Sequence, residues 1–249
     1  MDSRYLNLFF FFCLALLAEI VGTIGGFGSS VFFVSASQFF VDFNTVLGLT
    51  GLLHIFSNLF KIFLFRKTIN WSITLWLGSS SLILAIIGAW LTSVVDFAYA
   101  KIILSLFLIT ISSLFLMKSK IKITPSKSNT FLSGGIAGFL AGYIGTGGAV
   151  RGLVLASFNL EKNFFVGTSA VIDFGVDLSR TIIYLEYKYL DASHAVYVPG
   201  LVLAAFLGSY LGKKALVKIN QDLFQRIVLV LIFITGILML INELQPVLK

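Results

Sequence analysis

The sequence has few charged residues and almost no cysteine or histidine. Asp, Glu, Lys and Arg make up only 12% of its 249 residues, about half the share that a soluble domain carries, which excludes an ordinary water-soluble fold. Cys13 is the single cysteine, and His54 and His194 are the only histidines, so a disulfide framework and a cysteine or histidine metal cluster are excluded. No GxSxG, Walker or HExxH motif occurs, and we expect no enzymatic activity, no cofactor and no bound metal.

Long hydrophobic segments are what the sequence has instead. Hydrophobic residues make up 58% of the chain, 26 residues are Phe, and the mean hydropathy is +0.99. A helix needs about 20 mainly apolar residues to cross a bilayer. Apolar segments of or near this length recur along the chain, at Tyr5–Val41, Val46–Phe65, Ile73–Val95, Ala98–Met117, Phe131–Phe158, Phe164–Leu185, Ala195–Leu211 and Leu223–Ile241. The sequence thus predicts an all-α, multi-pass protein whose surroundings are a lipid bilayer.

The two ends of this pattern need separate interpretation. The first 17 residues resemble a signal peptide, but the apolar pattern continues to Val34 without a small-residue cleavage site, so we expect this segment to stay in the membrane. The formal net charge of +7 comes mostly from Lys and Arg in short loops between apolar segments. There they indicate membrane orientation, and we expect no nucleic-acid partner.

Four patterns recur in the same order in both halves of the chain, which favours an internal duplication. They pair IGGFG with IGTGG, Ala36-Ser37 with Ala156-Ser157, AKIILSLFLIT with QRIVLVLIFIT, and His54-x-x-x-Asn58-x-x-Lys61 with Asp173-x-x-x-Asp177-x-x-Arg180. The polar stretch IKITPSKSN separates the halves. We predict a first membrane repeat at residues 1–120, a cytoplasmic linker at 121–129 and a second repeat at 130–249.

Basic loops are placed differently in the two halves. They fall at 66–67 and 118–127 in the first half and at 213–218 in the second, whereas the loop at 186–191 is not basic. Basic loops stay in the cytoplasm, so equivalent loops are predicted on opposite sides of the membrane. The expected fold is two inverted repeats, each with a Gly-broken re-entrant or short-helix hairpin and three transmembrane helices, and both termini lie outside the cytoplasm.

A glycine-rich break interrupts the first apolar segment of each half. Glycine lets the backbone turn at membrane depth and approach a ligand closely, and a helix that begins there points free N–H groups at an anion. Paired broken helices bind substrate in transporters, whereas a single break is more typical of close helix packing. We predict substrate binding at Gly25, Gly26, Gly28, Ser29 and Ser30 and at Gly145, Thr146, Gly147 and Gly148.

Each half also carries a trio of polar residues spaced i, i+4 and i+7, which places the trio on one helix face. An ionisable side chain near the bilayer centre costs about 2.5–3.5 kcal/mol on insertion scales and normally faces the protein interior. Asn58, Lys61 and Arg180 are therefore candidate anion ligands. Alternatively, Asp177 and Arg180 form an internal ion pair that holds helices together, or Lys61 and Arg180 extend to the membrane surface.

Further ionisable residues lie inside the apolar segments. Arg151 has no acidic residue nearer in sequence than Glu161, and it is a candidate oxyanion ligand or, alternatively, a residue bonded to helix-end carbonyls. Buried ionisable groups form proton relays in transporters, and the candidates for a coupling proton are Asp173, Asp177, His54 and Glu19. His54 and Glu19 are equally compatible with hydrogen-bonded structural roles.

Several motifs occur in a familiar order: GTIGGFGSS from Gly22, GYIGTGGA from Gly142 and VGTSAVIDFGVDLSRTIIYL from Val166, with Gly88 and Gly208 in the third helix of each half. On these motifs the sequence resembles the sulfite exporter TauE/SafE family (the sulfonate-uptake permease superfamily) over essentially its whole length. The resemblance implies secondary transport of small sulfur-containing anions such as sulfite, thiosulfate or organosulfonates. It also implies the bacterial inner (cytoplasmic) membrane. Ser169, within the third motif, joins the candidate substrate ligands.

The sequence therefore predicts a proton-coupled secondary transporter that binds a small anion at the two glycine breaks near the membrane midplane. A second copy of the chain, in a homodimer, is one option for a partner. Two alternatives stand beside this prediction: a channel-like anion pathway and a non-transporting accessory membrane subunit.

Overall fold

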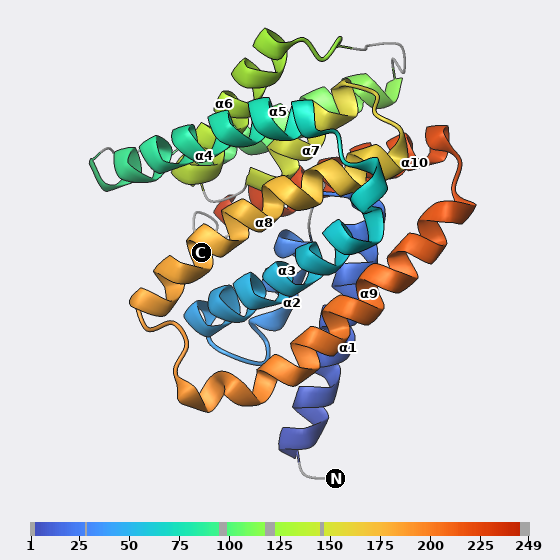
Figure 1. The fold of residues 1–249 in the computed structure, drawn as a ribbon. Coiled ribbons are helices and arrows are strands. Elements are labelled where there is room, and N and C mark those ends of the chain that lie inside the picture. The colour runs from blue at the N-terminus through green and yellow to red at the C-terminus, as the bar shows by residue number, and fades with distance from the viewer. Residues whose placement is uncertain (1–2, 28, 95–98, 118–122, 145–146, 245–249) are drawn as a thin grey trace.

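Helices make up almost all of the part of the chain that the computed structural model describes, which is residues 3–27, 29–94, 99–117, 123–144 and 147–244. They are α1 (Ser3–Gly25), α2 (Ser30–Ser37), α3 (Phe43–Phe65), η1 (Arg66–Thr68), α4 (Trp71–Val94), α5 (Ala100–Met117), α6 (Lys127–Ile144), α7 (Gly147–Ser157), α8 (Lys162–Glu186), η2 (Ala192–Tyr197), α9 (Val198–Lys218) and α10 (Gln221–Leu244) (Figure 1). These ranges contain no β-strand, and the prediction of an all-α fold is confirmed.

Local sequence signals explain where several helices begin and end. The side chain of Asp42 caps α3 by accepting the Thr45 N–H at 3.1 Å, and hydrogen bonds from Thr45 hold the pKa of this exposed carboxyl below its usual range. The first apolar segment divides because α1 ends at Gly25 and Gly26 follows with φ +72°, a left-handed conformation that favours glycine. α2 then begins at Ser30.

Five of the described helical segments are long and apolar enough to cross a membrane: Leu6–Gly25, Phe43–Thr68, Trp71–Gly88, Ala192–Lys218 and Gln221–Leu244. Large apolar side chains on the outside of these segments are exposed, among them Phe9, Leu17, Phe63, Leu75 and Ile86. A water-soluble protein rarely exposes so much contiguous apolar surface, but lipid accommodates it. The expected multi-pass membrane protein is confirmed at this level.

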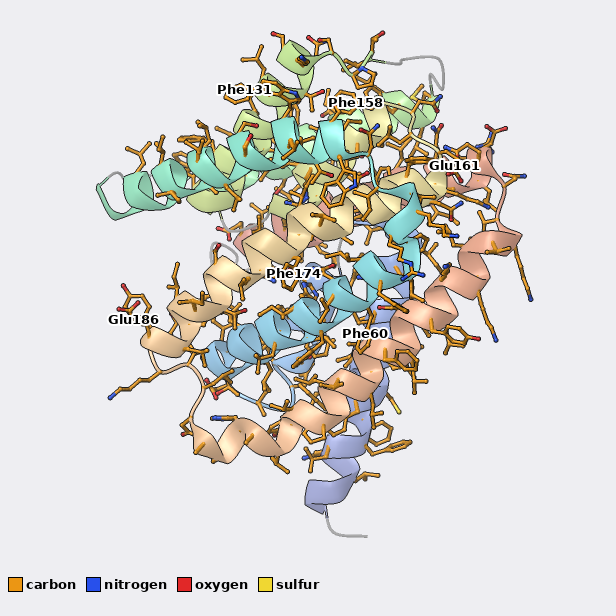
Figure 2. All side chains as sticks on the ribbon, in the orientation of Figure 1. Phe60, Phe131, Phe158, Glu161, Phe174 and Glu186 are labelled. Carbon is orange, nitrogen blue, oxygen red and sulfur yellow. The ribbon has the colours of Figure 1, made fainter. Side chains whose placement is uncertain are left out.

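The helices pack as pairs around a central pair formed by α3 and α8. α1 packs against α9, α4 against α6, and α5 against α10. α9 covers the side of α3 away from α8, where the rings of Phe60 and Phe206 lie 5.2 Å apart (Figure 2). Two hydrophobic clusters fill the interior: one includes Phe11, Phe33 and Leu53, and the other includes Phe27 and Phe165. The α3–α8 pair is therefore enclosed by other helices for much of its length.

The contact between α4 and α6 is close because small residues line it. A Cβ atom on Gly138 would overlap the Ser81 carbonyl, and a Cβ on Gly88 would overlap the Phe139 carbonyl. The Ser81 hydroxyl donates to the Gly134 carbonyl at 2.8 Å. Helix pairs in membranes use small residues in this way to bring their backbones together.

The connecting segments gather at two ends of the molecule. The links after α3, α7 and α9 lie at the right of Figure 1, and those after α2 and α8 lie at the lower left. Glu161 and Glu186 mark the two ends of α8 in Figure 2. The right-hand links carry or adjoin the basic residues Arg66, Lys67, Lys162, Lys214 and Lys218.

Candidate functional site

The packing of α3 against α8 brings the two predicted polar trios together. His54, Asn58 and Lys61 are buried on α3, and Asp173 and Asp177 are buried on α8. Arg180 ends the second trio with a side chain that is 26% exposed. The i, i+4, i+7 spacing places each trio on one face of its helix, and these two faces meet inside the bundle.

Glu19 and Lys61 form the first buried ion pair of this region. Lys61 Nζ lies 3.1 Å from Glu19 Oε2 and 3.3 Å from the Ser57 hydroxyl. The Ser29 hydroxyl donates to Glu19 Oε1 at 3.1 Å. Lys61 is only 4% exposed, so its ammonium group turns into the protein and does not extend to the membrane surface.

Asp177 and Arg180 form the second ion pair, as one of the sequence interpretations had it. Arg180 Nη2 lies 2.8 Å from Asp177 Oδ1, and the Asn58 amide donates to Asp177 Oδ2 at 2.8 Å. The Asn58 contact joins α3 to α8 directly. The carboxylate of Asp177 is thus shared between one residue of its own helix and one of the facing helix.

Arg151 and Asp173 form the third pair, which the sequence did not predict. Arg151 on α7 is 4% exposed, and its Nη2 contacts Asp173 Oδ1 on α8. The Ser169 hydroxyl donates to the other oxygen of Asp173 at 2.9 Å. Arg151 also lies within electrostatic reach of Asp177 and Arg180, so the pair adjoins the rest of the site.

His54 lies between the first two pairs and contacts both of them. Its Nε2 is 3.2 Å from the Ser29 hydroxyl and 3.5 Å from Glu19 Oε1. Its Nδ1 is 3.3 Å from the Ser30 hydroxyl, 3.3 Å from Arg180 Nη2 and 3.6 Å from Asp177 Oδ2. The three pairs together with His54, Ser29, Ser30, Ser57, Asn58 and Ser169 are called the ionic cluster below.

The two glycine breaks approach each other beside the ionic cluster. A Cβ on Gly148 would lie 2.5 Å from the Phe27 carbonyl, and Gly152 packs against the Phe27 ring. Gly26 lies against Phe165 and Val166 at the start of α8, and Gly25 lies against Leu231 of α10. Gly147 is the first residue of α7. Gly28, Gly145 and Thr146, which were also predicted to bind substrate, lie outside the described residues.

The charges of the ionic cluster balance when His54 is neutral. Lys61, Arg151 and Arg180 supply three positive charges, and Glu19, Asp173 and Asp177 supply three negative ones. Within the described part of the chain, the Nε atoms of Arg151 and Arg180 are buried without a hydrogen-bond partner. Each guanidinium therefore retains a donor for an additional acceptor, and an oxyanion supplies acceptors of this kind.

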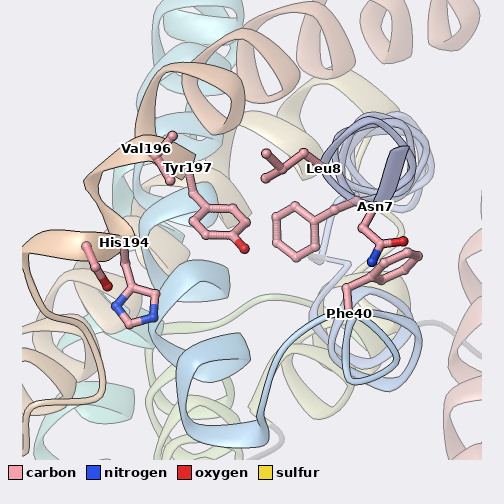
Figure 3. Close-up of a pocket in the computed structure, with 8 residues that line it drawn as sticks. Asn7, Leu8, Phe40, His194, Val196 and Tyr197 are labelled. Carbon is pink, nitrogen blue, oxygen red and sulfur yellow. The ribbon is translucent and has the colours of Figure 1, made fainter. Parts of the chain in front are cut away.

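A pocket of about 270 Å³ lies at the end of the molecule where η2 and the start of α1 meet (Figure 3). It is lined by Asn7, Leu8, Phe11, Phe40, Ser193, His194, Val196 and Tyr197. Phe11 lies eight residues before Glu19, roughly 12 Å along α1, and it packs edge to face with the buried Phe33 ring at 5.4 Å. None of the residues that line the pocket belongs to the ionic cluster.

His194 has a local structural role at that pocket. Its Nδ1 accepts the Asp191 N–H at 3.1 Å, and the Asp191 side chain accepts the Ser193 N–H at 2.8 Å, which completes a capping box for η2. The hydrogen bonds from Ser193 hold the pKa of Asp191 below its usual range. Among the described residues, no group of three or more His, Cys, Asp or Glu side chains is arranged to hold a metal ion.

Sequence reasoning missed Ser57 and the partners of Lys61 and Arg151. Ser57 precedes Lys61 by four residues, which is the spacing of neighbours on one helix face, so this contact had a local signal. The Glu19–Lys61 and Arg151–Asp173 pairs depend on how four helices pack, and no spacing in the sequence reports that.

The fold and the ionic cluster define a class: a multi-pass α-helical membrane protein with a buried, charge-balanced polar site. The family model described as "Sulfite exporter TauE/SafE" matches residues 11–239, nearly the whole chain. The chain therefore belongs to the TauE/SafE family, and the resemblance stated from its motifs is confirmed. Comparisons with curated proteins and with solved structures give no match.

Proposed function

We propose that the protein is a proton-coupled secondary transporter of a small sulfur-containing oxyanion, which binds at the ionic cluster between the glycine breaks. The family, whose description is that of sulfite exporters, favours a sulfur anion. The observation that carries the proposal is the convergence of three cationic side chains on the ionic cluster: Lys61 and Arg151 are buried, and Arg180 is 26% exposed. Charged groups inside membrane helices are costly and normally mark a transport pathway.

The anion would take the place of an internal carboxylate. Arg180 Nη2 is held by Asp177 and Arg151 Nη2 by Asp173, while neither Nε–H group has an acceptor among the residues that the structure describes. An oxyanion with two or more oxygens matches the fork of donors on a guanidinium group, which a single-atom anion does not. Asn58, Lys61, Ser169 and the Ser29 and Ser30 hydroxyls would complete the ligand set.

An inverted-repeat carrier is the architecture that we infer for this function. If a two-fold axis in the membrane plane relates the two repeats, α1 corresponds to α6 and α4 corresponds to α9. The α1–α9 contact then corresponds to the α6–α4 contact, and both contacts are present. Residues 1–120 and 130–249 would then be the two repeats, joined by a cytoplasmic linker at 121–129. Alternating access would arise from rocking of these repeats about the central α3–α8 pair, in a bacterial cytoplasmic membrane.

The experiment is counterflow in proteoliposomes loaded with sulfite, thiosulfate, sulfoacetate or taurine, with a simple carboxylate as the control anion and with and without a pH gradient. Saturable exchange of at least one sulfur anion is expected. Arg180→Gln removes hydrogen bonds to a charged group worth about 1.5–3 kcal/mol, so the exchange rate at low substrate should fall roughly 10- to 100-fold. Arg226→Gln changes an exposed arginine on α10 and is the matched control.

Each alternative function has its own signature in this assay. Non-saturating anion flux without counterflow would indicate the channel-like pathway. A folded wild-type protein that moves none of the sulfur anions would overturn the proposal and favour the accessory-subunit alternative. Equal rates for Arg180→Gln and Arg226→Gln would show that Arg180 is not a ligand.

A further inference from the structure

His54 is the only member of the ionic cluster that contacts two of its three ion pairs. Glu19 of α1 faces its Nε2, and Asp177 and Arg180 of α8 face its Nδ1. At the start of α2 the neighbours are the hydroxyls of Ser30 and of Ser29, the residue that precedes the helix. A change in the charge of His54 therefore alters its electrostatic interactions with α1, α2 and α8 together.

The remaining charged groups around His54 are already compensated. Lys61, on the same helix, is paired with Glu19, and Arg151 of α7 is paired with Asp173. On α9, the Lys213 ammonium donates to the Leu64 carbonyl at 2.6 Å, near the far end of α3. Because the other six charges cancel, a proton on His54 leaves the ionic cluster with one uncompensated positive charge.

The contacts at Nδ1 cannot all form in one protonation state. Arg180 Nη2 is a donor only, so Nδ1 can accept its hydrogen bond only when that nitrogen carries no proton. Asp177 Oδ2, at 3.6 Å, is an acceptor, so it attracts Nδ1 only when that nitrogen does carry a proton. Neutral His54 with its hydrogen on Nε2 therefore binds Arg180, whereas protonated His54 binds Asp177 and repels Arg180.

We propose that protonation of His54 draws Asp177 away from Arg180 and frees the Arg180 guanidinium for one oxyanion, so that each bound anion is accompanied by one proton. This inference rests on the proposed transport function and deepens it, because it assigns the coupling proton to one residue. The proton is taken from hydronium in the surrounding water: the N–H bond at Nδ1 forms as one O–H bond of hydronium breaks, and water is released. Loss of that proton restores the Asp177–Arg180 pair and expels the anion.

The test is proton uptake on anion binding, measured with a pH-indicator dye and purified full-length protein in weakly buffered detergent. Thiosulfate and methanesulfonate are suitable probes because neither changes its own charge between pH 6 and 8. We expect about one proton taken up per anion bound and therefore, by linkage, an affinity that falls by up to about tenfold per pH unit as the pH rises. Anion binding without proton uptake would overturn the coupling and leave the transport proposal standing.

Three variants test whether His54 is the residue that takes up the proton. His54→Gln should bind anion with no proton uptake and no pH dependence, and His54→Lys, with its fixed charge, should bind without pH dependence but more tightly than His54→Gln. His194→Gln changes the only other histidine, which caps η2 outside the ionic cluster, and should behave as wild type. Proton uptake that persists in His54→Gln would assign the proton elsewhere and refute the inference. Absence of anion binding by the folded wild type would instead remove the transport proposal and this inference with it.

Discussion

Arg151 is a fully charged side chain buried among apolar residues of α7. Its neighbours Val150 and Leu153 are buried with it, and its guanidinium is compensated by Asp173. Removal of one partner of a buried pair leaves the other charge without compensation and typically costs about 3–5 kcal/mol. Joint removal of both partners is much less costly, which makes the pair suitable for a double-mutant cycle.

We predict that Arg151→Gln and Asp173→Asn each lower the free energy of unfolding by about 3 kcal/mol or more. The double variant should be destabilised by clearly less than the sum of the two. The measurement is the unfolding midpoint of detergent-solubilised protein, with Glu186→Gln, an exposed acid at the end of α8, as the control. Strict additivity of the single effects would mean that the two side chains are not paired.

The sequence predicted the two polar trios at the residue scale, because spacing within one helix fixes which face a side chain occupies. It could not predict which charges pair across helices. Glu19 and Lys61 are 42 positions apart, and Arg151 and Asp173 lie on helices joined by a turn. These contacts depend on the depth and rotation of whole helices, which the hydrophobic pattern constrains only weakly.

At the scale of elements, the close approach of α4 and α6 depends on glycine. Gly138 faces the Ser81 carbonyl, so an added methyl group would collide with backbone that cannot move aside. Gly135, on the same helix, faces the end of the Leu84 side chain, with 3.6 Å between the added Cβ and Leu84 Cγ, an ordinary van der Waals contact. The two glycines thus differ in the space around them but share one helix.

Gly138→Ala should therefore destabilise the protein by about 1–3 kcal/mol, the usual cost of overpacking, whereas Gly135→Ala should be neutral or slightly stabilising because alanine favours helix. Unfolding midpoints of both variants in the same detergent give the comparison. Equal midpoints for the two variants would contradict the close α4–α6 packing.

Among the features of single elements, the division of the first apolar segment was the one that the glycine pattern predicted best. A segment of 37 residues, Tyr5–Val41, is too long for one span, and the helix does end at Gly25 where the glycines cluster. The short helix α2 was harder to foresee, since an eight-residue helix gains little from its own hydrogen bonds. Its stability comes from packing against α1 and α3.

At the scale of the whole molecule, basic residues concentrate at the end that holds the links after α3, α7 and α9 (Figure 1). By the positive-inside rule we expect this end to face the cytoplasm. The link between α8 and α9 lies at the other end, where Glu186 ends α8 and Asp191 precedes η2. The sequence indicated this division from loop charges alone, but it could not indicate how the helices between the loops are paired.

Cysteine labelling can test the orientation because Cys13 is the only native cysteine. In a Cys13→Ser background, Glu186→Cys should react with a membrane-impermeant maleimide in cells whose outer membrane is permeabilised and whose inner membrane is intact. Lys67→Cys and Lys218→Cys should react only after the inner membrane is opened. All three positions are exposed, so reagent access is not limited by folding. Labelling of Glu186→Cys and Lys67→Cys from the same side would rule out the proposed orientation.

The balance of three cations against three carboxylates has a consequence for energetics in the cell. A membrane potential does work only on net charge that moves through it, about 2.3 kcal/mol per elementary charge for 100 mV. In the carrier that we propose, the empty cluster with neutral His54 has no net charge, and the cluster that holds one proton and one monovalent anion has none either. Both forms would cross the electric field without electrical work. The direction of transport would then follow the pH and anion gradients alone, and the voltage across the membrane would neither drive nor oppose it.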